Sequence, residues 1–311
     1  DGAGFETRCA GAACGGPAED GYRAAVTALA LLPYLGAGHT HTRPGPWRAT
    51  VRDGLAALLD LQSGDGSFGR GAKRGYGAAI GTLAVAEAYG LSGSDVLRDP
   101  AQRAVDRLVA TQGRLGGWRY RPGDGASDSS VTGWAVTALA AARRAGLHVP
   151  PETLTRCRRW FEGRTSDDGR VGYLGRGSGT DALLGVGLFC RVLLGDRPDD
   201  DDLPAVAARL AARPPEWPAD GAQATGYGAG DPTHWAYGGL AAYQVARVTW
   251  EVWEPRLRAL LLDHQRPDGC AAGSWDPAGA TGRHGGRVVT TALGALALEV
   301  AYRYPRTSFG R

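Results

Sequence analysis

The chain has 311 residues, of which 43% are hydrophobic and 22% are charged, a composition typical of globular proteins. The formal net charge is only +3 and no Lys/Arg run is present, so nothing indicates a nucleic-acid-binding surface. No segment is long and apolar enough to predict a transmembrane helix.

Residues 1–21 are expected to form a Gly-rich N-terminal loop. The chain contains no Met, so we expect that Asp1 is not the native start and that the sequence is a processed or partial product. Cys9 and Cys14 in this loop are candidates for a disulfide bond or for two metal ligands, but no CxxC pair accompanies them. Cys157 and Cys190 fall in apolar helical patterns, which predicts small buried hydrophobes.

Six helical segments of one small, apolar type recur along the chain. Aligning them on a shared Ala/Gly-Leu step gives intervals of 54, 56, 49, 52 and 53 residues. Because the segments are apolar all round, they predict inner helices buried on every face, beginning near residues 22, 76, 130, 181, 233 and 288. The aligned leucines are predicted to be nearly fully buried: Leu29, Leu83, Leu139, Leu188, Leu240 and Leu293.

Amphipathic segments with charged faces alternate with the inner ones and predict outer helices. They are Trp47–Gln62, Ala101–Gln112, Pro151–Glu162, Asp202–Arg213 and Glu254–Gln265. Prolines in or near their first turns fit this assignment, because the first turn needs no N–H there: Pro100, Pro151, Pro204 and Pro255. Only five such segments are present, so we expect the first outer helix to be missing or to precede Asp1.

Alternating buried and amphipathic helices predict an all-α fold, a single α/α toroid of six helical-hairpin repeats that spans residues 1–311 as one domain. In such a toroid an inner barrel of helices is ringed by an outer barrel. Ring closure would bring residues 5–20 close to residues 266–285, because the loops leading into the first and sixth inner helices should share a face.

Gly-rich connectors follow several outer helices and begin near a Gln: Gln62–Gly69, Gln112–Trp118 and Gln265–Trp275, with a degenerate copy at Glu162–Tyr173. Asp-Gly predicts a turn with positive φ, the Gln is expected to bond neighbouring backbone, and the aromatic residue to pack on the next helix. The repeated Q-x-x-D-G-x-[FW] element resembles the repeats of squalene-hopene cyclases and prenyltransferase β subunits. It is most similar to single-toroid prenyltransferase and squalene oxidase repeat proteins of planctomycete-type bacteria, supported by Leu31–His41, Gly117–Trp134 and Gly285–Pro305.

The resemblance to class II terpenoid cyclases implies an Asp-x-Asp-Asp proton donor at the mouth of an inner helix. Here only Asp128 matches, as the last Asp, while the other positions hold Gly125 and Ser127. A lone Asp before a helix is also the usual N-cap, and capping is the stronger interpretation. Cyclases line their cavity with aromatic rings, and the candidates at inner-helix starts are Tyr22, Tyr76, Trp134, Trp235 and Tyr237, with packing of connectors as the alternative.

The resemblance to protein prenyltransferases implies zinc held by Asp-x-Cys and a His on the next inner helix. Asp181 and His234 match, and Tyr237 matches a further family position, but the Cys position holds Leu183. Zinc needs at least three protein ligands, so we predict no metal and no cofactor. His39 and His41 form H-x-H after the first inner helix, where a helix-end hydrogen-bonding role is favoured over a metal site.

The sequence therefore favours a divergent, non-catalytic toroid that binds an apolar, isoprenoid-like ligand or a protein partner at the cavity mouth. A cyclase-like isomerase using Asp128, and a zinc prenyltransferase-like enzyme, remain as alternatives. The predicted ligand-binding residues are Tyr22, Tyr76, Trp134, Asp181, His234, Trp235 and Tyr237.

Overall fold

Every regular element in residues 21–69, 74–121, 125–177, 179–197, 202–219 and 226–303, which the computed structural model describes, is a helix. Two isolated antiparallel bridges lie in connectors within these ranges. The helices fall into two compact units, Asp20–Glu162 and Gly163–Arg311. Of the helices described, none combines the length and apolarity that a membrane span requires.

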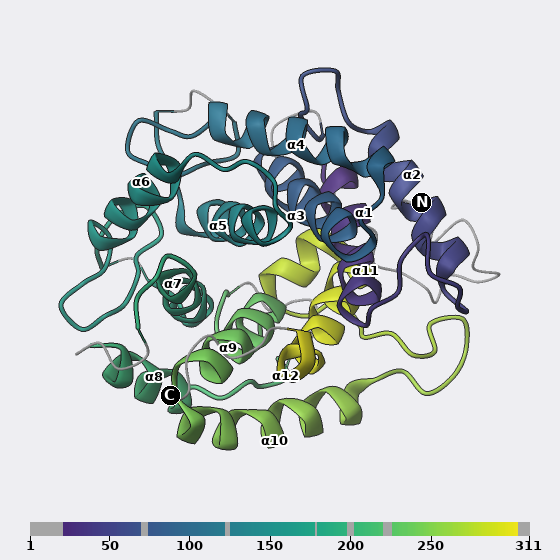
Figure 1. The fold of residues 1–311 in the computed structure, drawn as a ribbon. Helices are drawn as coiled ribbons and strands as arrows, with labels where there is room; N and C mark the ends of the chain where they lie inside the picture. Colours follow the sequence, from purple (N-terminus) through teal and green to yellow (C-terminus); the bar gives the residue numbers. More distant parts are fainter. Residues whose placement is uncertain are drawn as a thin grey trace. The chain divides into compact units, whose positions relative to one another are not determined.

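In the first unit three inner helices pack in a row. They are α1 (Arg23–Gly36), α3 (Arg74–Ser92) and α5 (Ser129–Arg144), and α3 contacts both of the others (Figure 1). The outer helices of this unit are α2 (Arg48–Asp60), α4 (Asp95–Ala110) and α6 (Pro151–Glu162). Each outer helix packs on the inner helix that precedes it in the chain.

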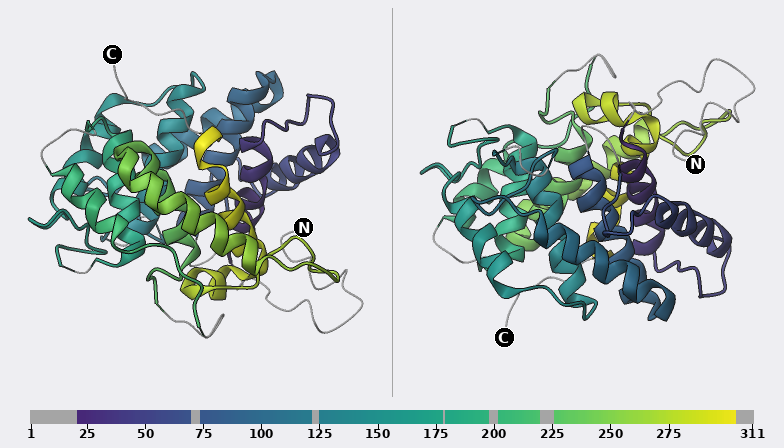
Figure 2. Two further views of the ribbon diagram at one scale, coloured as in Figure 1. Left: turned by 90° about the horizontal axis from the view of Figure 1, so that it is seen from below. Right: turned by 90° about the horizontal axis from the view of Figure 1, so that it is seen from above.

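In the second unit α9 (Pro232–Val245) is central and contacts α7 (Asp181–Leu193) and α11 (Gly279–Leu298). The outer helices are α8 (Leu203–Ala211) and α10 (Arg247–His264). The left view of Figure 2 shows α10 as the long green helix that packs on α9. A short helix, α12 (Val300–Arg303), also contacts α9.

Burial separates the two kinds of helix as the composition predicts. On α5 an unbroken run from Val131 to Ala140 is buried, so the helix is covered on all faces. On α2 only Val51, Leu55 and Leu58 are buried, at the spacing of one helical stripe. Within each unit, helices buried on all faces therefore alternate with helices buried on one face only.

The predicted inner-helix starts agree with the structure to within two residues for the first five helices. The sixth, α11, begins at Gly279 and contains a non-helical residue, Gly286, with φ 71° and ψ −170°. Its part beyond Gly286 corresponds to the predicted start near 288.

Two outer helices begin earlier than predicted. The structure starts α4 at Asp95 and α10 at Arg247, so Pro100 and Pro255 lie inside helices and not in first turns. A proline after the first turn removes one backbone hydrogen bond, a cost that tertiary packing of these helices offsets. The other expectation holds, since Pro151 and Pro204 lie in the first turns of α6 and α8.

Five of the six aligned leucines are at most 3% exposed, as predicted. Leu240 is only half-buried, so that part of the prediction is wrong. The two residues before Leu240 make the close contacts of α9 with other helices. A Cβ on Gly238 would meet Trp253 at 2.4 Å, and a Cβ on Gly239 would meet Val300 at 3.4 Å. Leu240 follows these glycines and lies off the face that they present.

The connectors tie successive repeats together. The Gln62 side chain donates to the carbonyls of Gly66 and Pro100, and Gln112 donates to those of Gly116 and Thr153. Each amide thus bonds its own turn and also the next outer helix. The predicted bonding to neighbouring backbone is confirmed, and the bond to the next outer helix is an additional contact that the sequence does not predict.

The cysteines have separate environments. Cys157 and Cys190 are not disulfide-bonded and are fully buried, the burial as predicted, and burial raises the pKa of the Cys157 thiol to about 12. Cys270 is disulfide-bonded. Cys9, Cys14 and the predicted approach of residues 5–20 to residues 266–285 lie outside the described residues.

Candidate functional site

Three tyrosine rings meet where the inner helices of the first unit begin. Tyr22 precedes α1, Tyr76 lies in the first turn of α3, and Tyr120 comes from the connector before α5. Ring centroids are 6.0 Å apart for Tyr22 and Tyr76 and 5.7 Å apart for Tyr76 and Tyr120. All three side chains are half-buried, so this tyrosine cluster keeps part of its surface in solvent.

A hydrogen-bonded chain connects the cluster to a buried carboxyl group. The Tyr76 hydroxyl lies 2.8 Å from Ser130 Oγ, and Ser130 Oγ donates to Asp128 Oδ1 at 2.8 Å. The backbone N–H of Val131 also donates to Asp128 Oδ1, at 2.9 Å. Asp128 therefore caps α5, which is the structural role that its position before a helix suggests.

Asp128 is fully buried, and burial raises the pKa of its carboxyl group. Its second oxygen, Oδ2, is also buried and has no hydrogen-bond partner among the described residues. A carboxyl group in these surroundings is more easily held neutral than one in water. The same burial keeps Oδ2 away from solvent.

Trp134 lies on α5 one turn beyond Ser130 and is 9% exposed. Residues four positions apart share a helix face, so Trp134 lies on the same face of α5 as Ser130. The structure thus brings Tyr22 and Tyr76 together, whereas Trp134 is a buried side chain of α5 that contributes little open surface.

In the second unit the Asp181 carboxylate is held by a two-point ion pair. Arg213 donates from Nε at 3.1 Å and from Nη2 at 2.7 Å to the two oxygens. His234 is buried, and its Nε2 is 2.8 Å from the carbonyl oxygen of the same Arg213. Asp181 and His234 therefore both bond Arg213, Asp181 through the Arg213 side chain and His234 through its backbone carbonyl.

Trp235 and Tyr237 on α9 are at most 2% exposed and do not line an opening in the second unit. Trp235 Nε1 donates to the Ala229 carbonyl at 3.0 Å, and its ring stacks on Trp217. Tyr237 meets Phe189 edge to face, with ring centroids 6.0 Å apart. Their surroundings are those of core aromatics.

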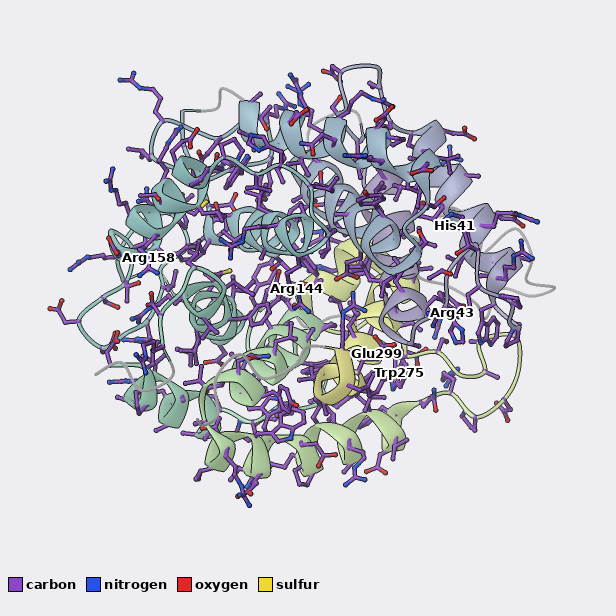
Figure 3. The ribbon with its side chains drawn as sticks, in the orientation of Figure 1. His41, Arg43, Arg144, Arg158, Trp275 and Glu299 are labelled. Atoms are coloured by element: carbon purple, nitrogen blue, oxygen red, sulfur yellow. The ribbon has the colours of Figure 1, made fainter. Side chains whose placement is uncertain are left out.

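No cluster of three or more His, Cys, Asp or Glu side chains with metal-binding geometry occurs within the described ranges. The H-x-H pair follows α1, in the loop where Figure 3 labels His41 and Arg43. Backbone hydrogen bonds cap the C-terminal end of α1: the Gly38 N–H donates to the Leu35 carbonyl, and the His39 N–H donates to the Tyr34 carbonyl. Neither ring nitrogen of His41 has a hydrogen-bond partner in the described structure, so the expected side-chain role at the helix end is not observed.

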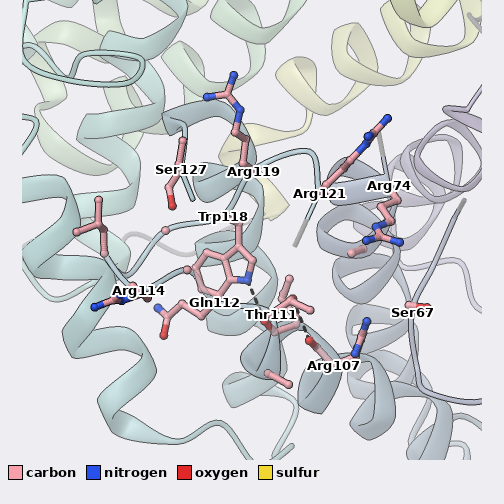
Figure 4. A pocket seen from close by; sticks show the side chains of 18 of the residues that line it. Ser67, Arg74, Arg107, Thr111, Gln112, Arg114, Trp118, Arg119, Arg121 and Ser127 are labelled. Carbon is pink, nitrogen blue, oxygen red and sulfur yellow. Dashed lines mark hydrogen bonds between the residues drawn. The ribbon is translucent and has the colours of Figure 1, made fainter. Parts of the chain in front are cut away.

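Beside the tyrosine cluster the first unit contains a cavity of about 480 Å³ (Figure 4). Five arginines line it: Arg74, Arg107, Arg114, Arg119 and Arg121. Neither this cavity nor the place of Tyr120 is predicted by the sequence, because the residues involved are scattered over α3, α4 and two connectors. A local signal existed only in the arginine-rich stretch Trp118–Arg121.

No protein-family model and no curated protein matches the sequence. Solved structures do match along most of the chain. The alpha-1,6-mannanase from Salegentibacter sp. has a TM-score of 0.63 at 11% identity, covering 90% of this chain and 90% of its own. A type II terpene cyclase from Scytonema, solved with geranylgeranyl dihydroxybenzoate, has a TM-score of 0.56 at 13% identity over 90% and 87%. A D-mannose isomerase has a TM-score of 0.60 at 13% identity over 92% and 87%.

The protein has the α/α toroid fold. Identities of 11% to 13% show the fold alone. The resemblance to squalene cyclases and prenyltransferases is only partly supported, because one terpene cyclase stands among neighbours that are mostly glycoside hydrolases. These neighbours are enzymes, so the comparisons give no support to a non-catalytic role for the toroid.

Proposed function

We propose that the protein binds a small apolar, isoprenoid-like ligand at the tyrosine cluster. The observation that carries the proposal is the meeting of Tyr22, Tyr76 and Tyr120, which leaves three adjoining rings partly open to solvent. Tyrosine offers a large rigid contact surface at a small entropy cost. The terpene cyclase neighbour, bound to a geranylgeranyl compound, supports an isoprenoid body for the ligand.

A glycosidase activity is less well supported. Glycoside hydrolysis uses a pair of carboxylates, and a Salegentibacter mannanase with two aspartates replaced is described as inactive. In the described ranges this chain has one adjacent pair, Asp167 and Asp168, in the connector before α7. Asp168 accepts from Ser166 Oγ and Arg170 Nε, both at 2.8 Å, and the Asp167 side chain is fully exposed. This is the geometry of a surface turn.

Titration with farnesol, followed by intrinsic Trp fluorescence, tests the proposal. Wild type should bind farnesol, and Tyr76→Ala should weaken binding about tenfold because ring contact area is lost. Tyr76→Phe keeps the ring and removes the hydroxyl, so it should bind within about twofold of wild type. Absence of saturable binding to wild type would refute the isoprenoid ligand and would favour a protein partner at the same surface.

A cyclase-like isomerase is the second candidate, favoured by the raised pKa of Asp128. The protonated carboxyl would transfer its proton to an alkene carbon, a ring would close, and loss of a proton would complete the isomerisation. Against it, Asp128 Oδ2 is buried, and Ser127 replaces a family aspartate. Incubation with squalene and mass spectrometry of the products decides: a cyclic product lost in Asp128→Asn, which keeps an N-cap oxygen, would support the candidate.

A zinc-dependent prenyltransferase-like activity has the least support. Arg213 occupies the Asp181 carboxylate with two hydrogen bonds, and Leu183 stands where a thiolate ligand is needed. Elemental analysis of the purified protein is expected to give no stoichiometric zinc. One zinc per chain, lost in His234→Ala, would reverse this conclusion.

A further inference from the structure

We propose that the arginine-lined cavity of the first unit is a binding site for a phosphate-bearing ligand. The site is separate from the tyrosine cluster, and the proposal does not depend on the proposed function.

The cavity lies between the C-terminal end of α4, the start of α3 and the connectors that follow α2 and α4. Its volume of about 480 Å³ lies in the range of small-molecule sites. Phe68 and Leu108 give it apolar walls. Trp118 adds an aromatic ring, and Ser67 and Ser127 add hydroxyl groups (Figure 4). A ligand with one charged group and a compact body fits such a lining better than a bare ion.

Among the described residues, the lining carries five guanidinium groups and no carboxylate. In the part of the chain that the structure describes, Arg74, Arg114 and Arg119 make no ion pair with Asp or Glu, while many other arginines do. Arg107 pairs with Asp65 at 3.4 Å, and both side chains are at least one-third exposed. An exposed pair of this kind is weak and leaves Arg107 available to a stronger acceptor.

Backbone and side-chain bonds bring together the segments that carry the arginines. The Gly75 N–H donates to the Tyr120 carbonyl at 2.9 Å, which places the start of α3 beside the stretch that carries Arg119 and Arg121. A Cβ on Gly75 would meet the Arg119 carbonyl oxygen at 2.2 Å, so the approach requires glycine. On the opposite side Trp118 Nε1 donates to the Leu108 carbonyl at 2.8 Å and fixes the connector on α4.

The chemistry of the side chains selects phosphate. Guanidinium groups stay charged at all accessible pH values and present a fork of donors that matches phosphate oxygens. Several like charges around one cavity repel each other and raise the local potential, and an anion relieves both effects. A phosphate group has enough oxygens to accept from more than one arginine at once.

Isothermal titration calorimetry with inorganic pyrophosphate at low ionic strength tests the site. The double variant Arg74→Gln/Arg107→Gln removes one guanidinium of α3 and one of α4 and leaves Arg119, which lies over the Tyr120 ring, in place. We expect it to weaken pyrophosphate binding at least about tenfold. Arg98→Gln is the matched control, because Arg98 is an exposed arginine of α4 outside the cavity, and it should change binding less than about twofold.

Three further arms complete the experiment. Citrate should bind more weakly than pyrophosphate if phosphate geometry is recognised, and equal binding would reduce the site to a non-specific anion patch. Vesicles containing phosphatidic acid distinguish a lipid head group from a soluble phosphate compound as the source. Farnesol binding should be unchanged in the double variant, so failure of this proposal and failure of the tyrosine-cluster proposal are distinguishable. No pyrophosphate binding by wild type, or an equal loss in Arg98→Gln, would overturn the proposal.

Discussion

The Tyr76 hydroxyl lies 2.8 Å from Ser130 Oγ, although the two residues are 54 positions apart in the chain. Tyr76 belongs to the first turn of α3 and Ser130 to the first turn of α5, so the bond joins the same ends of successive inner helices. Because Ser130 also donates to Asp128, the half-exposed tyrosine cluster is connected to a fully buried carboxyl group.

Asp128→Asn is predicted to alter the pH dependence of stability. Burial raises the pKa of Asp128 above its usual value of 3.8 in the folded protein, so the folded state binds this proton more tightly than the unfolded state does. As pH rises from 3.8 through the folded pKa, wild type therefore loses stability that the amide variant does not lose. Urea unfolding at several pH values should show the difference in unfolding free energy moving in favour of Asp128→Asn as pH rises.

Asp128→Ala serves as the contrast. It removes both the titrating group and the N-cap, and loss of a cap costs about 1 kcal/mol at any pH. The Asn and Ala variants should share the same pH dependence and differ by a constant offset. An unchanged pH dependence in both would show that Asp128 is not the group responsible.

Gln112→Ala is predicted to destabilise the protein more than Gln265→Ala. Gln112 donates to the carbonyls of Gly116 and Thr153 and so joins its connector to α6, whereas Gln265 has a bond to Gly273 within its own connector. Leaving two partly buried carbonyls without a donor should cost about 1–3 kcal/mol. Chemical denaturation measures both variants, and equal losses would show that the bridge to α6 adds nothing.

The helical repeat could be predicted because burial on every face changes composition along an entire segment. The run from Val131 to Ala140 contains no charged residue, and this signal survives in the sequence without any knowledge of partners. The starts of α4 and α10 were missed for a local reason. Pro100 and Pro255 predict first turns, because proline is favoured there, while the structure accommodates both inside helices.

The candidate sites could be predicted only in part. Tyr22 and Tyr76 occupy matching places in consecutive repeats, so the period points to both. Tyr120 joins them through the backbone bond from Gly75 to its carbonyl, a long-range contact that has no periodic signal. The arginine cavity depends on the same contact and was therefore invisible in the sequence.

The three described cysteines are predicted to differ in thiol reactivity. Cys157 and Cys190 are fully buried, and the thiol pKa of Cys157 is raised to about 12, so neither should react with iodoacetamide in the folded protein. Cys270 is disulfide-bonded and should react only after reduction. Mass spectrometry of alkylated native, reduced and unfolded protein checks all three. Labelling of Cys270 without reductant would contradict the disulfide.

His234→Gln is predicted to flatten the loss of stability under mildly acidic conditions. Burial lowers the pKa of His234 below its usual value of 6.5 in the folded protein. Below pH 6.5 the unfolded state therefore binds a proton at His234 more readily than the folded state does. The unfolding free energy of wild type should therefore decrease by up to about 1.4 kcal/mol per pH unit because of this group as pH falls below 6.5. Gln cannot titrate but can still donate to the Arg213 carbonyl. Thermal unfolding at pH 7.5, 6.5 and 5.5 should show the smaller decrease in the variant.

Gly116→Ala is predicted to destabilise the protein much more than Gly146→Ala. Both glycines have positive φ, 95° and 79°, so both substitutions share the strain of a left-handed backbone. They differ in surroundings. A Cβ on Gly116 would meet the Arg156 carbonyl oxygen of α6 at 2.3 Å, whereas one on Gly146 would meet nothing within 4 Å. Gly146→Ala should therefore cost about 1 kcal/mol, and Gly116→Ala should cost more, because the connector must move away from α6 and strain the bond from Gln112 to Thr153. Denaturant unfolding of the two variants measures the difference, and equal costs would mean that the connector shifts freely and does not hold the repeats together.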